Sequence, residues 1–132
     1  MPQQCQSYEI LDEADRNIKS GIENGYYCDD DTRSDIDHGD YKGSGWYRMM
    51  NPAGTKIPEV APPLGQCGTN APGWLNGAHP DGLGQTVSRE VCFNYFGNKC
   101  WTKTTIKVIN CGGFYVYELP RTSICPHRYC AE

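Results

Sequence analysis

Eight cysteines, none of them in a Cys-x-x-Cys pair, constrain this 132-residue chain more than any other feature. They are spread along its whole length, at Cys5, Cys28, Cys67, Cys92, Cys100, Cys111, Cys125 and Cys130. An even number of dispersed cysteines is typical of a disulfide framework formed in an oxidising compartment. Zinc is the rival explanation, but zinc sites usually take their ligands in close pairs. We therefore expect four disulfides in a secreted, extracellular protein, and the sequence leaves open which cysteines pair.

The rest of the composition predicts one small domain over residues 1–132. Fifteen glycines and nine prolines indicate many turns and little helix. A chain of this length buries a modest core, so cross-links contribute much of its stability. No apolar run approaches the ~20 residues of a membrane helix, and we expect no membrane insertion.

The net charge of −4 is concentrated in one stretch, where six of the sixteen acidic residues lie between positions 29 and 40. The chain has no basic stripe for nucleic acid, so we expect no nucleic-acid partner. The acidic stretch has two interpretations, a solvated loop or a calcium site, because calcium prefers carboxylate oxygens. The candidate ligands are Asp35, Asp37 and Asp40. Their spacing fails the EF-hand template, since Gly39 and Trp46 stand where that template needs oxygen ligands.

Hydrophobic patterning predicts few regular elements in the first two thirds of the chain. Over residues 8–22 the apolar positions recur at spacings of three and four, which allows a short amphipathic helix. Trp46 and Tyr47 are expected to begin a strand. Residues 51–84 are rich in proline and glycine and are expected to be mostly loops. Residues 87–92 alternate loosely and favour another strand.

The clearest structural signal is an antiparallel hairpin formed by residues 104–109 and 114–119. Both segments are rich in β-branched or aromatic residues, and Asn110-Cys111-Gly112-Gly113 separates them. Alternation places Ile106 and Val108 on one face of the first strand. It places Tyr115, Tyr117 and Leu119 on one face of its partner. The predicted fold is therefore a small, mainly-β, disulfide-rich single domain with little helix.

Enzymatic motifs are missing from the sequence. There is no nucleophile elbow, phosphate-binding loop or His-Glu-x-x-His segment. A pair of acidic residues could act as in glycosidases, but nothing singles out two among Glu59, Asp81, Glu90 and Glu118. Every cysteine is expected to be used in a bridge, which leaves no thiol nucleophile. We expect a protein that is not an enzyme.

A family resemblance extends over nearly the whole chain. Its most specific part is the run Cys67-Gly-Thr-Asn-Ala-Pro-Gly-Trp-Leu-Asn-Gly-Ala-His-Pro80. It also includes Gly45-Trp-Tyr-Arg48, Val87-Ser-Arg-Glu-Val-Cys92, Val108-Ile-Asn-Cys111 and Phe114-Tyr-Val-Tyr-Glu-Leu119. In these segments the chain resembles the cysteine-rich domain of uromodulin and of the pancreatic zymogen-granule glycoprotein.

The resemblance implies a mainly-β fold in which residues 8–16 are extended, against the helix allowed above. Domains of this family with ten cysteines carry one more near residues 59–61 and a second next to the position of Cys100. Here Trp101 follows Cys100 and no cysteine lies between Cys28 and Cys67. The joint loss of two cysteines is what a missing fifth bridge predicts, which supports four closed bridges.

The resemblance also implies non-catalytic functions. Members of the family act partly as glycan decoys that present N-linked sugars to bacterial adhesins. No Asn-x-Ser/Thr sequon occurs in this chain, so that role does not carry over through N-glycans. The first remaining hypothesis is a lectin-like protein that binds glycans or glycoproteins at cell surfaces, with calcium as a candidate cofactor. Trp74, Asn76, His79 and Asp81 are its predicted ligand-binding residues, because they combine an aromatic ring with polar groups that bind hydroxyls.

The alternative is an extracellular protein–protein interaction or matrix-assembly module from a longer multidomain chain. Such a module would use exposed tyrosines flanked by acidic residues, such as Tyr26, Tyr27 and Tyr41. For the lectin we expect a homodimer or larger oligomer, since several linked weak sites gain avidity. Composition does not decide between the two hypotheses.

Overall fold

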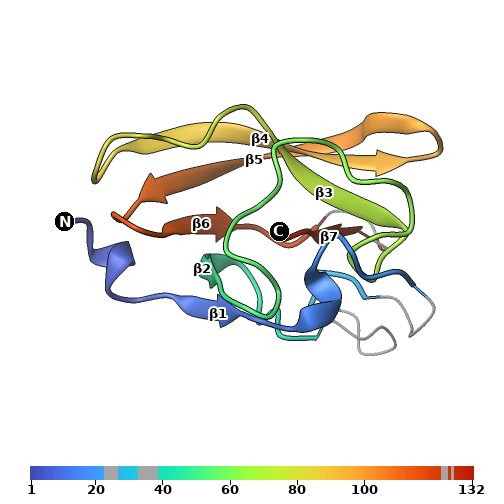
Figure 1. The fold of residues 1–132 in the computed structure, drawn as a ribbon, viewed down its shortest axis with the longest axis horizontal. Helices are drawn as coiled ribbons and strands as arrows, with labels where there is room; N and C mark the ends of the chain where they lie inside the picture. The colour runs from blue at the N-terminus through green and yellow to red at the C-terminus, as the bar shows by residue number, and fades with distance from the viewer. Residues whose placement is uncertain (23–26, 33–38, 123–124, 126) are drawn as a thin grey trace.

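The computed structural model describes residues 1–22, 27–32, 39–122, 125 and 127–132. Its strands form one seven-stranded sheet in the order β1-β2-β6-β5-β4-β3-β7 (Figure 1). They are β1 Glu9–Leu11, β2 Gly45–Met49, β3 Ala71–Asn76, β4 Thr86–Tyr95, β5 Asn98–Asn110, β6 Tyr115–Leu119 and β7 His127–Tyr129. Two short 3-10 turns, η1 Gln3–Cys5 and η2 Ala14–Arg16, are the helical elements of the described residues, and neither could cross a bilayer. The predicted small, mainly-β fold with little helix is confirmed.

The predicted hairpin is the β5–β6 pair. Its strands are antiparallel, with Ile109 opposite Val116 and Asn110 opposite Tyr115. Gly112 and Gly113 have φ angles of 76° and 94°, which close the turn at the left-handed positions expected of glycine. β5 is much longer than the hairpin requires, because it also pairs with β4 along most of its length.

The main hydrophobic core lies on one face of the sheet, which we call the inner face. Strand alternation brings apolar side chains to this face, and those of Leu75, Val91, Ile106, Tyr117 and Leu119 are buried there. The prediction that Ile106 shares a face with Val108, and Tyr115 with Tyr117 and Leu119, is thereby confirmed. A smaller cluster of Cys5, Ile109, Cys111 and Val116 lies on the opposite, outer face, where Trp46 packs against it.

All eight cysteines form disulfides, as predicted, and none is free. The pairs are Cys5–Cys111, Cys28–Cys125, Cys67–Cys130 and Cys92–Cys100. Cys5–Cys111 ties the N-terminal segment to the outer face at the end of β5. Two bridges hold the segment that contains β7, and Cys92–Cys100 closes the far end of the β4–β5 hairpin.

The amphipathic helix allowed over residues 8–22 is wrong. The extended conformation that the family resemblance implies for residues 8–16 is confirmed at β1, whereas Ala14–Arg16 form the 3-10 turn η2. Leu11 is buried because β1 pairs in parallel with β2. Ala14 and Ile22, which the helical pattern would bury, are exposed. The fully buried side chain is Arg16, a charged residue that the pattern assigns to the solvent.

The prediction that residues 51–84 are mostly loops is confirmed, but β3 was not predicted, and Pro72 and Gly73 lie inside it. A Cβ atom on Gly73 would lie 2.7 Å from the ring of Phe93 on β4. The glycine therefore makes room for an aromatic ring of the core, rather than for a turn. Residues 86–95 form a strand that includes the predicted segment 87–92.

Candidate functional site

Two of the four predicted sugar-binding residues lie together on the outer face of the sheet. Trp74 and Asn76 are two residues apart on β3, and they stand opposite Cys92 and Glu90 of β4. The indole N–H of Trp74 donates to the carbonyl oxygen of Lys99 at 2.8 Å, which fixes the ring against the β4–β5 hairpin. Trp74 is half-buried and Asn76 is exposed.

His79 lies instead over the inner face, in a chain of hydrogen bonds. Its Nδ1 atom is 2.5 Å from Oε2 of Glu59, and its Nε2 atom is 2.8 Å from the hydroxyl of Tyr117. The same hydroxyl accepts the backbone N–H of Ile57. Both ring nitrogens are thereby used within the fold, and a ring centroid of Tyr115 lies 4.5 Å from that of the imidazole.

This arrangement favours a neutral His79. Burial lowers the pKa of the imidazole, although the Glu59 carboxylate opposes the shift. The hydrogen bonds from His79 lower the pKa of Glu59. With Nδ1–H donating to Glu59, Nε2 accepts the hydroxyl proton of Tyr117, and a second ring proton would displace that bond. Asp81 is exposed beyond His79. The structure thus divides the predicted set between two faces, and its role in sugar binding stays a prediction.

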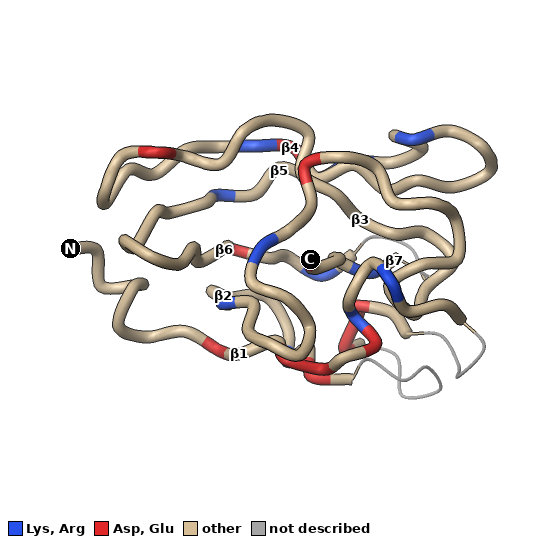
Figure 2. Tube along the Cα trace, in the orientation of Figure 1, with Lys and Arg blue, Asp and Glu red and all other residues tan. Residues whose placement is uncertain are grey.

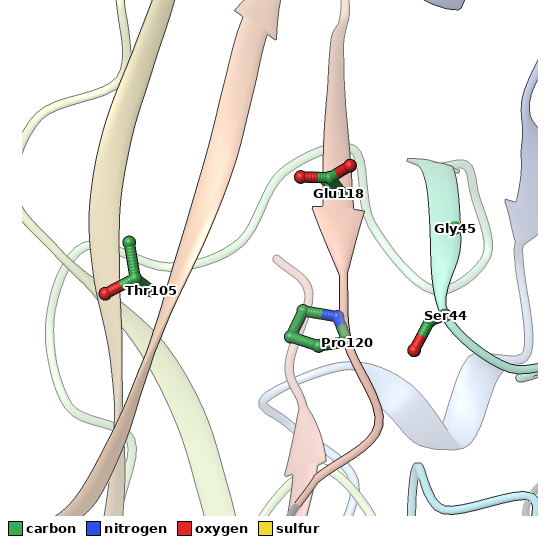
Figure 3. Close-up of a pocket in the computed structure, with 5 residues that line it drawn as sticks. All are labelled: Ser44, Gly45, Thr105, Glu118 and Pro120. Atoms are coloured by element: carbon green, nitrogen blue, oxygen red, sulfur yellow. The ribbon is translucent and has the colours of Figure 1, made fainter.

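A hollow of about 310 Å³ opens on the outer face where β2 begins and β6 ends (Figure 3). Its lining residues are Ser44, Gly45, Thr105, Glu118 and Pro120. The carboxylate of Glu118 is exposed. Gly45 lacks a side chain, so its backbone lines the hollow directly. The hollow thus offers one carboxylate, two hydroxyl groups and apolar walls.

A row of polar side chains runs from this hollow across the outer face to β3. Thr105 stands opposite Glu90, and Glu90 stands opposite Asn76. Glu90 also forms an ion pair of 3.2 Å with the ammonium group of Lys103. The hollow and the row share one face with Trp74, and together they form the candidate site, which we call the outer-face site.

Sequence reasoning finds Trp74 and Asn76 but misses the hollow. In the sequence, Glu118 is one of four candidate acidic residues, and nothing distinguishes it from the other three. The available signal is alternation, because Glu118 lies out of phase with the buried Tyr117 and Leu119. The register that brings Thr105 and Ser44 beside it involves segments distant in sequence, which alternation does not specify.

The calcium prediction falls only partly within the described residues. Asp35 and Asp37 lie outside them. The carboxylate of Asp40 accepts the guanidinium of Arg16 at 2.7 Å and the backbone N–H of Asp12 at 2.9 Å. Although burial alone would raise the pKa of Asp40, Arg16 lowers it. Calcium binding therefore stays a prediction, and Asp40 would have to exchange an existing ion pair for the metal.

A second group of metal-ligand atoms gathers Cys28, Asp30 and Cys125 within 4.8 Å of one another. Cys28 and Cys125 are bridged to each other, so neither supplies the thiolate that a metal requires. We assign this group to the disulfide rather than to a metal site.

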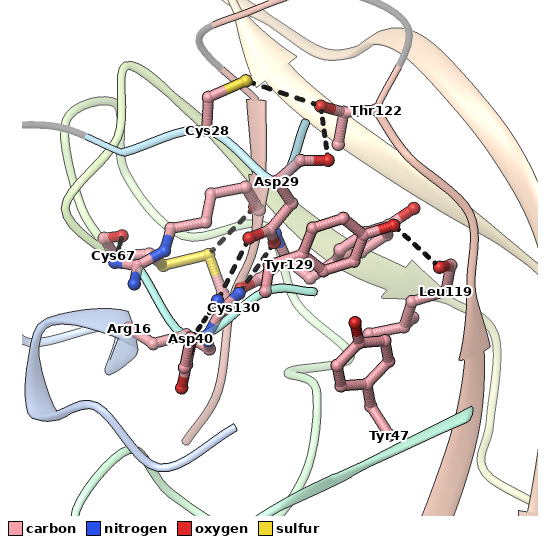
Figure 4. A network of polar contacts seen from close by, with 12 residues as sticks. Arg16, Cys28, Asp29, Asp40, Tyr47, Cys67, Leu119, Thr122, Tyr129 and Cys130 are labelled. Carbon is pink, nitrogen blue, oxygen red and sulfur yellow. Dashed lines mark hydrogen bonds and ion pairs between the residues drawn. A yellow bond between two sulfur atoms is a disulfide. The ribbon is translucent and has the colours of Figure 1, made fainter. Parts of the chain in front are cut away.

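Part of the acidic charge serves a buried ion network (Figure 4). The guanidinium of fully buried Arg16 binds both carboxylate oxygens of Asp29, at 2.7 and 3.0 Å, and the carbonyl oxygen of Tyr129 at 2.9 Å. Burial would lower the pKa of Arg16, but Asp29 and Asp40 raise it above its ordinary value. The network lies beside Cys28 and the Cys67–Cys130 bridge, and it joins η2 to β7.

Comparison with known proteins identifies the family of this chain. The family model for the uromodulin-like domain matches residues 47–131. The chain therefore belongs to the uromodulin-like domain family.

Individual relatives match almost the entire chain. The pancreatic secretory granule membrane major glycoprotein GP2 of Canis lupus familiaris is 38% identical over 129 residues, which are 97% of this chain and 23% of the relative. Uromodulin of Rattus norvegicus is 37% identical over 97% of this chain and 18% of the relative. The Homo sapiens GP2 is 36% identical over 96% of this chain and 21% of the relative. The chain thus spans about a fifth of the length of these relatives.

Proposed function

We propose that this chain is a non-catalytic, extracellular recognition domain that binds carbohydrate at the outer-face site. The observation that carries the proposal is the hollow of about 310 Å³, which Glu118 lines together with the hydroxyl-bearing Ser44 and Thr105. Four closed disulfides support the extracellular setting, because such bridges persist in oxidising compartments.

The chemistry of the hollow suits a sugar. A carboxylate can accept hydrogen bonds from two adjacent sugar hydroxyls, and bonds to a charged acceptor are about twice as strong as neutral ones. Hydroxyl groups of Ser44 and Thr105 can both donate and accept. The volume lies at the lower end of the ~300–1,000 Å³ range of ligand pockets, which fits one or two sugar units.

The row from Thr105 through Glu90 to Asn76 offers further polar contacts along the sheet. A longer glycan could follow it toward the half-buried ring of Trp74. We therefore propose a terminal sugar in the hollow and extended contacts along the row.

A glycan array with purified, oxidised protein tests this function. Glu118→Gln keeps the shape of the side chain and removes its charge, so affinity should fall about 10–100-fold, as expected for one lost charged hydrogen bond. Asp81→Asn is the matched control, because it removes an exposed carboxylate outside the outer-face site. If Asp81→Asn loses binding and Glu118→Gln does not, the sugar binds near Asp81, as predicted from the sequence, and not in the hollow.

Repeating the array with a chelator tests calcium separately. Unchanged binding would assign recognition to the protein's own groups. Loss of binding would show that glycan recognition requires a bound metal ion. A blank array from correctly bridged protein would exclude the lectin function.

Protein binding is the second candidate function, although the predicted tyrosine patch does not carry it, because Tyr41 is fully buried and Tyr26 lies outside the described residues. The end of the β4–β5 hairpin carries a group of exposed aromatic side chains, and such groups are enriched at protein interfaces.

A further inference from the structure

The end of the β4–β5 hairpin projects away from the sheet (Figure 1). Tyr95 pairs with Asn98, so Phe96 and Gly97 form a two-residue turn. Their φ angles are 53° and 75°, which are the positive values of a type I′ turn. Asparagine or glycine suits this position, whereas a bulky residue there is strained. The side chain of Phe96 is nevertheless 70% exposed, so burial of this side chain adds little to the stability of the fold. Strain of this kind is concentrated at functional positions.

The aromatic side chains beside Phe96 are held in place before any partner arrives. The rings of Tyr95 and Phe96 stack with centroids 4.0 Å apart, and Trp101 lies 5.3 Å from each. Tyr95 packs against the main core, and Cys92–Cys100 closes the two strands behind the turn. We call Tyr95, Phe96 and Trp101 the aromatic tip. Pre-ordered aromatic groups lose little entropy on binding.

A loop next to β4 carries two further exposed apolar residues. The amide of Asn94 donates to the carbonyl oxygen of Pro62 at 2.8 Å, which holds this loop beside the hairpin. Val60 and Leu64, on either side of Pro62, are exposed apolar residues. An apolar surface built from two segments is typical of an interaction site.

The charge around this surface is basic. It comes from Lys99, which is exposed next to the turn, whereas Lys103 is paired with Glu90 and Lys107 stands opposite Glu118 toward the other end of β5. The complementary surface on this protein is strand β1, at the edge of the sheet. There Ile10 is 43% exposed and Asp12 presents an exposed carboxylate, while the carboxylate of Glu9 is paired with Lys42.

These two surfaces lie on different sides of the molecule, with the lysine of the hairpin end at the upper right and the acidic residues along β1 at the bottom (Figure 2). We infer that the aromatic tip of one molecule docks on the β1 edge of a second copy of this chain. Apolar groups meet in this contact, and Lys99 faces Asp12. A tip-to-tip contact would instead bring lysines together. Because the two docking surfaces differ, the contact is head-to-tail and can extend to further copies.

Sedimentation velocity of the oxidised protein across a concentration series tests the inference. We expect concentration-dependent association that weakens when the salt concentration rises from about 50 to about 500 mM, because screening shortens the range of the charge attraction. Phe96→Asn should abolish association and keep the fold, because asparagine suits the turn. Leu83→Asn is the matched control, since Leu83 is also 70% exposed but lies outside both surfaces.

A charge exchange tests which surface receives the tip. Lys99→Glu and Asp12→Lys should each weaken association at low salt, because each variant alone brings like charges together. An equimolar mixture of the two should recover association, since the new glutamate of one molecule then meets the new lysine of the other. Failure of that recovery would overturn the assignment of the β1 edge.

Two other outcomes would overturn self-docking altogether. One is a wild-type chain that stays monomeric at every concentration, or that associates equally well with Phe96→Asn. The other is a monomeric chain that co-sediments with vesicles of phosphatidylcholine and phosphatidylserine only when Phe96 is intact. That result would assign the tip to a lipid surface. The inference is independent of sugar binding, which a monomer can be tested for separately.

Discussion

At the scale of single residues, the acidic stretch supplies the carboxylates that bind Arg16 and join η2 to β7. Asp29 and Arg16 are both fully buried and bind each other in a two-bond pair. A buried charge without its partner is costly, because it has lost its contact with water. The sequence indicates neither side of this pair, since its acidic stretch reads equally as a solvated loop or a calcium site.

Arg16→Ala should lower the free energy of unfolding by about 3–5 kcal/mol, because it leaves the carboxylate of Asp29 buried without a cation. Lys42→Ala is the control, since it breaks an exposed ion pair with Glu9 and should change stability by less than about 1 kcal/mol. Urea unfolding of both variants measures the difference. Equal effects would contradict a structural role for the buried pair.

His79 should make stability depend on pH. Its folded-state pKa is below the ordinary value near 6.5, so the unfolded chain takes up a proton first as pH falls. The stability that neutral His79 contributes is fully present at a pH above 6.5, and it is lost as the pH falls through the folded-state pKa. Urea midpoints of wild type and His79→Gln between pH 7.5 and pH 5 isolate this part, because glutamine does not titrate. Identical pH profiles would show that His79 is not buried in its neutral form.

At the scale of elements, the two longest strands form an arm that one short disulfide closes, whereas another bridge spans most of the chain. Cys92–Cys100 joins residues eight apart, and Cys5–Cys111 joins residues 106 apart. A bridge that closes a longer loop removes more entropy from the unfolded chain.

Replacing both cysteines of a bridge by serine should therefore cost more for Cys5–Cys111 than for Cys92–Cys100. We expect losses of about 4–5 and about 2–3 kcal/mol, respectively. Urea unfolding of the two double variants gives the comparison. A greater loss from the short bridge would show that native contacts at the hairpin end outweigh the entropy of the unfolded chain.

The elements also show which parts of the fold the sequence predicts. The β5–β6 hairpin is predicted correctly because its signal is local, in alternation and a glycine turn. β3 is missed because Pro72 and Gly73 resemble a loop until the ring of Phe93 is known to lie against them. In the outer-face site, Trp74 and Asn76 are the residues that the sequence already proposes as ligand-binding. The hollow depends on the register of β2, β5 and β6, and is therefore a property of the sheet.

At the scale of the whole molecule, the two proposed activities lie on separate surfaces. The outer-face site lies around Glu118, and the docking surfaces lie at the aromatic tip and along β1. A weak sugar site gains avidity when several copies are joined. Self-docking would thus strengthen glycan binding at a surface without changing the site itself.

This separation gives a paired expectation. Phe96→Asn should leave the affinity for a soluble glycan unchanged and abolish agglutination of glycan-coated beads. Glu118→Gln should lose the glycan and retain self-association. Isothermal calorimetry, bead agglutination and sedimentation measure the three properties. Loss of soluble-glycan affinity in Phe96→Asn would show that the two surfaces are not independent.

The positions of the disulfides also determine what happens when the backbone is cut. Cys5 and Cys28 are bridged to Cys111 and Cys125, so two covalent links cross any cleavage between residues 29 and 66. Limited proteolysis in residues 51–66, which contain no strand, should leave one band on a non-reducing gel and two on a reducing gel. A molecule nicked by extracellular proteases would therefore remain a single covalent particle, and it would come apart only where thiols are present.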